Sequence, residues 1–229
     1  MPLIRCKFIK QKDMIYISHL DVLRLLDRAF RIAGIKINFS QGFNPHPKIS
    51  FGQALSLGVA SLGEYVDIDI AEKIKEDVFI QKINSVLPDG LKFVQAKYID
   101  ENAPSLMKTI TCASYIIELK LNKKYTLDDI KSSVDEFMNK DEIIFTKENK
   151  KGKLVDLNIR PMIYKLNVIS YEDDIVKLDT LVSSSSENNL KVNILVDKLL
   201  ETSEIEADNI FITRKDFYTF KNGKLVTPI

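Results

Sequence analysis

Apolar residues recur along the first hundred positions in two patterns, one with a period of two and one with a period of three to four. The shorter period predicts strands and the longer one predicts helices. Strands are predicted at 3–9, 35–39, 48–57, 64–70 and 91–99, and residues 14–17 are expected to continue the first strand or to pair with it. Helices are predicted over 18–34 and 77–87, and we interpret the order as β-α-β-β-α-β.

The first of these helices has recognisable ends. Ser18 followed by Asp21 fits a capping box, in which the serine hydroxyl accepts from a free backbone N–H. Gly34 fits the position just past the last turn. The spacing predicts an inward apolar stripe of Leu20, Leu23, Leu26, Phe30 and Ala33.

The second half of the chain repeats this plan after a polar linker at 101–110. Helices are predicted over 126–138, with Thr126 as the N-cap, and over 189–200. Strands are predicted at 114–121, 143–145, 154–159, 162–170, 175–181 and 210–220, which includes one hairpin more than the first half has. The sequence thus predicts an α+β fold of two tandem ferredoxin-like (βαββαβ) halves with antiparallel sheets, in domains 1–100 and 111–229.

Composition indicates an ordinary globular protein, with 45% hydrophobic and 28% charged residues. The net charge is only +1, so attraction to nucleic acid requires a local patch. Residues 1–50 hold nine Lys and Arg against three Asp, and Arg24, Arg28 and Arg31 share the outer face of the first helix. These arginines are candidates for binding RNA phosphates, and the alternative is an ordinary solvated face.

Two cysteines, Cys6 and Cys112, lie far apart and outside any CxxC pair, which argues against a disulfide framework or a zinc site. We therefore expect neither a metal nor a cofactor. The N-terminus lacks the apolar stretch of a signal peptide, and no run of about 18 apolar residues suggests a membrane span. The expectation is a cytoplasmic protein without a membrane partner.

The segment from Ser40 to Pro47 is the strongest candidate for a functional loop. Two prolines stiffen it around His46, and a stiff loop carrying polar side chains suits binding. Gly42 permits a positive φ, Phe43 could stack on a base or enter the core, and Asn44 could cap a turn or recognise a hydrogen-bonding edge. The candidate binding residues here are Gln41, Gly42, Phe43, Asn44 and Lys48.

Other polar residues give weaker signals. His46 or His19 could serve as a general acid or base if the protein is an enzyme. Arg160 and Arg214 lie at or in strands, where arginine can bind phosphate, although a surface role is commoner. Asp67 and Asp69 share one strand face, which more often indicates a solvated face than a metal site.

Several motifs together resemble the radical-SAM-linked protein family, a bacterial domain of unknown function. They are Tyr16-Ile17-Ser18-His19-Leu20-Asp21, Arg28-Ala29, Ala33-Gly34, the run from Ser40 to Phe51 that includes GFNPHP, Leu57-Gly58-Val59 and Glu64-Tyr65. The tail from Arg214 to Pro228 and the segment Leu157 to Pro161 are also similar. The chain lacks a three-cysteine cluster motif and resembles the stand-alone form.

This resemblance implies a radical SAM protein as partner and a setting in RNA or ribosome modification. The first hypothesis is a noncatalytic RNA-binding or adaptor protein that serves such an enzyme. The alternatives are a metal-independent endoribonuclease using His46 or His19, and a purely structural interaction domain.

Overall fold

The computed structural model describes residues 2–149 and 151–229. The chain divides into two compact units, of which the first comprises residues 1–111 and 214–229 and the second residues 112–213. The predicted second half, 111–229, differs from the second unit because residues 214–229 pack in the first. The fold is α+β, and in the described part of the chain nine strands belong to one hydrogen-bonded sheet and two further strands pair only with each other. Strand β10 (Ala207–Lys221) contributes residues to both units.

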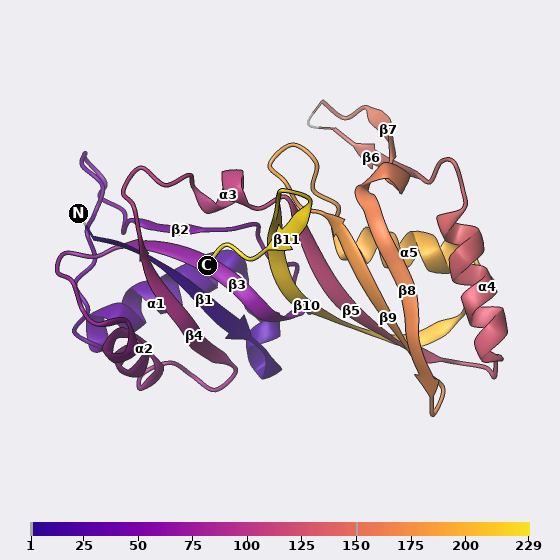
Figure 1. Ribbon diagram of the computed structural model, residues 1–229, viewed down its shortest axis with the longest axis horizontal. Helices are drawn as coiled ribbons and strands as arrows, with labels where there is room; N and C mark the ends of the chain where they lie inside the picture. The colour runs from indigo at the N-terminus through magenta and orange to yellow at the C-terminus, as the bar shows by residue number, and fades with distance from the viewer. Residues whose placement is uncertain (1, 150) are drawn as a thin grey trace. The chain divides into compact units, whose positions relative to one another are not determined.

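In the first unit, the strand order is β4-β1-β3-β10, with β2 on β3 and β11 on β10 (Figure 1). Strand β1 is antiparallel to both of its neighbours. The elements are β1 (Leu3–Lys10), α1 (His19–Ile32), β2 (Ile49–Phe51), β3 (Ala60–Asp69), α2 (Glu76–Asn84), β4 (Leu91–Ile99), the short α3 (Leu106–Thr109) and β11 (Lys224–Val226).

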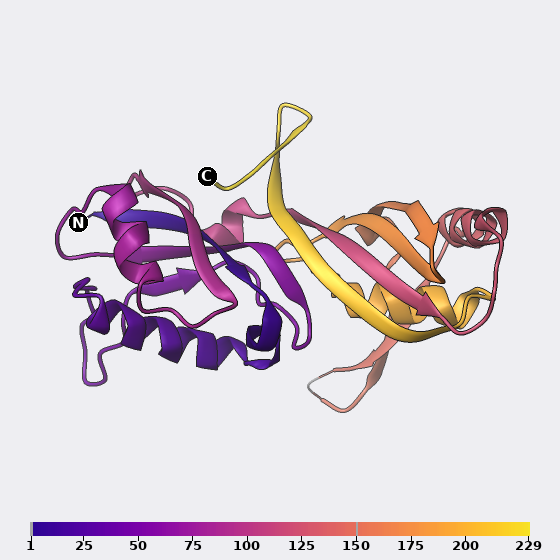
Figure 2. The ribbon, with the colours of Figure 1, turned by 90° about the horizontal axis from the view of Figure 1, so that it is seen from below.

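One core joins both long helices to the same face of this sheet (Figures 1 and 2). Alternate residues of β1 and β3 point toward the helices, as the pleat of a strand requires. The cluster contains Ile4, Cys6 and Phe8 of β1, Val66 and Ile68 of β3, Leu26, Ala29 and Phe30 of α1, Phe79 and Ile83 of α2, and Phe93 of β4. Cys6 is a fully buried, small member of this core.

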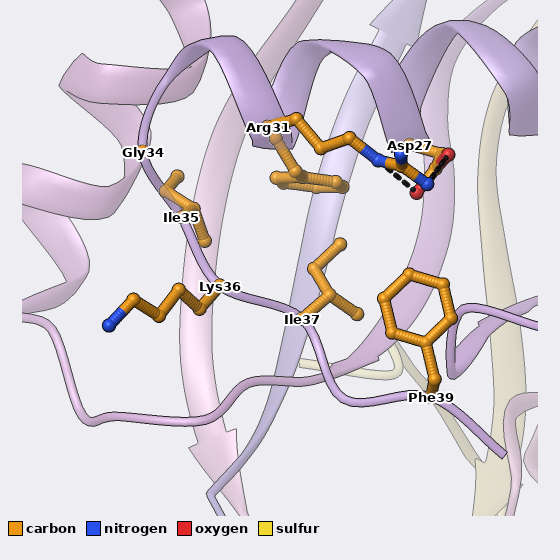
Figure 3. Close-up of a pocket in the computed structure, with 8 residues that line it drawn as sticks. Asp27, Arg31, Gly34, Ile35, Lys36, Ile37 and Phe39 are labelled. Carbon is orange, nitrogen blue, oxygen red and sulfur yellow. Dashed lines mark hydrogen bonds and ion pairs between the residues drawn. The ribbon is translucent and has the colours of Figure 1, made fainter. Parts of the chain in front are cut away.

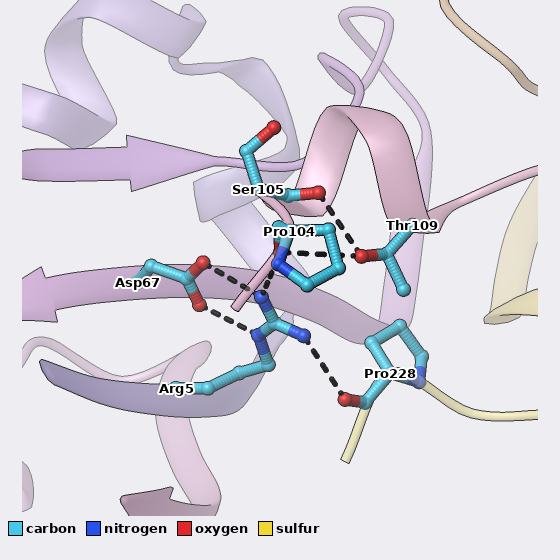
Figure 4. Close-up of polar contacts among 6 residues, drawn as sticks. All are labelled: Arg5, Asp67, Pro104, Ser105, Thr109 and Pro228. Atoms are coloured by element: carbon cyan, nitrogen blue, oxygen red, sulfur yellow. Dashed lines mark hydrogen bonds and ion pairs between the residues drawn. The ribbon is translucent and has the colours of Figure 1, made fainter. Parts of the chain in front are cut away.

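The opposite face of β1 and β3 carries a buried polar network. Arg5 donates from Nε and Nη2 to the two carboxylate oxygens of Asp67, at 2.7 and 2.9 Å. Its Nη2 also donates to the carbonyl of Pro104 and its Nη1 to that of Pro228 (Figure 4). Asp67 therefore lies buried in an ion pair, and its interpretation as part of a solvated face is wrong.

Three local predictions for this unit are also wrong. Residues 12–16 form a 3-10 helix, η1 (Lys12–Tyr16), where a strand was expected at 14–17. The segment 35–39 makes only isolated bridges, Ile37 with Ile70 and Phe39 with Pro47, because the proline- and glycine-containing loop directly follows it. The predicted linker 101–110 contains α3, and Leu106 and Ile110 are buried.

In the second unit, the strand order is β10-β5-β9-β8. Helices α4 and α5 contact each other, and a separate hairpin, β6-β7, extends away from the rest of the unit (Figure 1). The elements are β5 (Cys112–Leu121), α4 (Leu127–Met138), β6 (Ile144–Glu148), β7 (Leu154–Asn158), the 3-10 helix η2 (Arg160–Met162), β8 (Ile163–Glu172), β9 (Ile175–Ser183) and α5 (Val192–Thr202).

The helix caps agree with the sequence. The Ser18 side chain accepts from the Asp21 backbone N–H, and Gly34 takes a φ of +67° after α1. Thr126 and Asp129 form a reciprocal capping box at α4. No helix in the described residues is long and apolar enough to cross a membrane.

Candidate functional site

The loop from Ser40 to Pro47 is fixed at its base and open at its tip. The His46 carbonyl accepts from the Ser40 N–H at 2.9 Å, and the His46 N–H donates to Ser40 Oγ at 3.0 Å. Further from the tip, the Lys48 N–H donates to the Asn38 carbonyl at 2.8 Å, which joins the two segments that lead into and out of the loop. These bonds and the two prolines hold the two arms of the loop together without help from the tip.

Every residue from Gln41 to His46 is exposed. The Phe43 side chain is fully exposed, so the alternative that it inserts into the core is wrong. Gly42 has a φ of +130°, a conformation that other residues rarely adopt, and this turn places Phe43 at the tip. A large aromatic side chain held in water on a pinned loop is available for a partner.

A cleft of about 440 Å³ lies between this loop and the outer face of the first unit's sheet. Its lining includes Ser40, His46 and Lys48 from the loop and its end, Asp67 and Asp69 from β3, and Ser105. The cleft therefore combines hydrogen-bond donors and acceptors with an imidazole, a set that suits a polar ligand.

The carboxylates of the cleft already hold cationic partners. Lys48 Nζ lies 3.0 Å from Asp69, and the Asn38 amide donates to the same carboxylate at 2.8 Å. Asp67 is held by Arg5. No group of three or more potential metal ligands is found among the described residues.

The arginines of α1 are exposed, as predicted, but two of them have acidic neighbours. Arg24 lies 3.5 Å from Asp21, and Arg31 lies 2.8 Å from Asp27. Among the described residues, Arg28 has no such ion pair. Arg28 is therefore the residue of this stripe whose charge is least compensated.

The other two predicted arginines lie outside this surface. Arg214 is 3% exposed, binds Glu64 at 2.6 Å and lies over the Phe217 ring. In the second unit, Arg160 is half-buried and donates to the carbonyls of Met138 and Ile163. Both guanidinium groups are engaged within their own units and are not part of the candidate surface.

The two histidines line different cavities of the first unit. His19 packs its ring against Phe51, with 4.8 Å between centroids, beside a hollow of about 20 Å³. Lys10 and Glu64 also line this hollow, and burial lowers the pKa of Lys10. Since His46 lines the larger cleft instead, the structure does not bring the two imidazoles together.

Sequence reasoning missed a second cluster of charged and polar side chains, on the same face of the sheet as Arg5 and Asp67. Lys7 binds Asp216 at 2.6 Å, and the Tyr65 hydroxyl donates to the same carboxylate at 2.7 Å. Burial, together with the Asp216 charge, raises the pKa of Tyr65. The available signal was the pair of charged positions, Arg5 and Lys7, that alternates with apolar residues in β1.

Comparison with protein families gives a direct assignment. A family model described as an uncharacterized protein conserved in bacteria (DUF2344) matches residues 3–192. The chain belongs to the DUF2344 family. A search of curated proteins finds no match to this DUF2344 chain.

Solved structures show a likeness of fold. A chain of a Cbf5-Nop10-Gar1 complex aligns with a TM-score of 0.50 and 12% identity, over 96% of the DUF2344 chain and 50% of that chain. An archaeal box H/ACA sRNP Nop10-Cbf5 complex gives 0.47 and 11%, over 93% and 46%. An H/ACA RNP bound to a substrate RNA gives 0.48 and 12%, also over 93% and 46%. The DUF2344 chain thus spans about half the length of these solved chains.

Proposed function

We propose that this DUF2344 protein is a noncatalytic RNA-binding protein, and that the loop from Ser40 to Pro47 with the α1 arginines forms its contact surface. The observation that carries the proposal is the fully exposed Phe43 on a loop pinned at its base. Aromatic side chains that stand in water beside cationic groups suit single-stranded RNA, because bases stack on the ring while cations bind phosphates.

The charges around the loop support an anionic partner. Lys48 at the end of the loop and Arg28 on α1 are exposed, and residues 1–50 carry a local excess of positive charge. Several acids offset this excess, including Asp27 and Asp69, so the surface is not uniformly basic. This balance of charges favours a few defined phosphate contacts over nonspecific binding of nucleic acid.

The fold proposal is that each unit is ferredoxin-like. In the first unit, the order β1-α1-β2-β3-α2-β4 with antiparallel pairing of β4, β1, β3 and β2 supports it. In the second, β5-α4-β8-β9-α5-β10 with the order β10-β5-β9-β8 supports it, the β6-β7 hairpin being an insertion. The likeness to a Cbf5 chain concerns the fold alone.

The proposed partner is a radical SAM enzyme that modifies RNA or the ribosome. Its support is the resemblance of the SHLD and GFNPHP segments to the radical-SAM-linked family. In this role the protein supplies RNA contacts and the enzyme supplies the chemistry.

Salt dependence tests the RNA proposal. Binding of a fluorescent single-stranded RNA should weaken with salt, with a log–log slope of about −0.7 for each phosphate contacted. Arg28→Ala should make the slope shallower by about 0.7, because one contact is lost. Lys92→Ala, which removes an exposed cation from β4, should leave the slope unchanged. Absence of binding, or binding that ignores salt, would refute RNA recognition and leave a protein adaptor.

A cleavage assay separates this function from the endoribonuclease alternative. Labelled RNA incubated with the wild-type protein should stay intact, because His19 and His46 line different cavities and cannot act as a pair. Cleavage by the wild type that His46→Ala abolishes would contradict a noncatalytic role. The readout is the RNA length on a denaturing gel over a range of pH.

A further inference from the structure

A second cavity of the first unit, of about 360 Å³, lies between the end of α1 and the segment 35–39 (Figure 3). Phe30 and Ile35, both buried, and Ile37 line its apolar side. Phe39 provides an aromatic wall and remains 38% exposed. We call this cavity the Phe39 pocket.

The rim of the Phe39 pocket carries an ion pair suited to hydrogen bonding. Arg31 donates from Nη2 to Asp27 at 2.8 Å and from Nε at 3.4 Å, and Figure 3 shows this pair across the pocket from Phe39. The Arg31 guanidinium also lies 5.9 Å from the Phe39 ring centroid. A guanidinium has five N–H donors and a carboxylate about four acceptor sites, so two bonds leave capacity on both groups.

The Phe39 pocket therefore offers a flat aromatic surface, an aliphatic floor, and a donor and an acceptor on one rim. Its volume lies within the range of about 300–1,000 Å³ typical of small-molecule sites. Lys36 also lines the pocket, with its side chain 76% exposed, and could reach a phosphate outside it. A nucleobase matches these features, because it is planar, stacks on aromatic rings and carries donors and acceptors on its edges.

We infer that the Phe39 pocket binds one nucleobase of an RNA strand, with the Asp27–Arg31 pair recognising its edge and Lys36 contacting its phosphate. This inference rests on the proposed function, since it names a base-binding site beside the loop. The loop tip and the pocket then act separately, because Phe43 lies outside the pocket while Phe39 forms its wall.

Two-dimensional NMR of the full chain tests the inference with the four ribonucleoside 5′-monophosphates as probes. At least one nucleotide should shift the amide signals of Gly34, Ile37 and Phe39. Ribose 5-phosphate, which lacks a base, should not. Phe39→Ala should weaken the response at least fivefold, whereas Phe211→Ala, the same substitution at an exposed ring of β10 outside the pocket, should keep it.

Asp27→Asn serves as a second variant if Phe39→Ala alters the dispersion of the spectrum. It should also weaken nucleotide binding, because it removes the ion pair while leaving the aromatic wall. Unchanged spectra with all four nucleotides, or equal shifts with ribose 5-phosphate, would overturn the pocket. RNA binding without nucleotide binding would refute the pocket alone, and nucleotide binding without RNA binding would refute the proposed function alone.

Discussion

Arg5→Met is expected to lower the free energy of unfolding by about 3–5 kcal/mol, the range for removing one partner of a buried ion pair. Arg5 is 4% exposed and Asp67 is 6% exposed, so the substitution leaves a carboxylate in the interior without its cation. The variant also loses the bonds that Arg5 donates to the carbonyls of Pro104 and Pro228. Urea unfolding followed by circular dichroism measures the difference.

A matched control separates burial from charge. Lys36→Met removes a cation whose ion pair with Glu72 is 76% exposed on both sides, and it should change stability by no more than about 1 kcal/mol. The double variant Arg5→Met with Asp67→Leu should recover part of the loss, because no unpaired charge remains. If the free energy of unfolding of Arg5→Met lies within about 1 kcal/mol of the wild-type value, the Arg5–Asp67 pair does not stabilise this face of the sheet.

The Arg5–Asp67 pair also matters for the cleft, since Asp67 lines it. Without Arg5, the cleft gains an uncompensated negative charge at Asp67. The ion pair that stabilises this face of the sheet therefore also determines the net charge of the cleft, where an anionic ligand would bind.

Local sequence patterns predicted the ends of helix α1 correctly, because backbone hydrogen bonds and backbone conformation determine where a helix ends. Ser18 and Gly34 mark the ends of α1 because capping depends on a few neighbouring residues. The helical stripe was less accurate: Leu26 and Phe30 are buried, but Leu20 is 61% exposed. Leu20 lies in the first turn, where the period of the helix does not reveal how far the core extends.

Contacts between segments that lie far apart in the sequence could not be predicted from local patterns. The buried state of Arg214 depends on Glu64, 150 positions away, and the partners of Arg5 come from residues 67, 104 and 228. A charged residue in a strand has the same local pattern whether water or another segment covers it. The loop around His46 was found because prolines and a glycine act locally, whereas its position beside Asp69 required the folded chain.

Phe43→Ala is expected to weaken binding of single-stranded RNA by about 5- to 150-fold, which corresponds to about 1–3 kcal/mol for one base stacked on an aromatic ring. The substitution should leave the free energy of unfolding unchanged, because the side chain is fully exposed. Fluorescence anisotropy with a labelled RNA gives the affinity, and urea unfolding confirms that the fold is intact.

The pattern of variants distinguishes stacking from mere apolar contact. Phe43→Trp should bind at least as tightly as the wild type, because indole offers a larger ring. Leu57→Ala, which shortens another exposed apolar side chain, should bind like the wild type. Since Phe43 carries no charge, Phe43→Ala should reduce affinity by the same factor at low and high salt, in contrast to Arg28→Ala. Equal affinity of Phe43→Ala and the wild type would exclude the tip as a base-stacking element, and the loop would then have to act through His46 and Lys48 in the cleft.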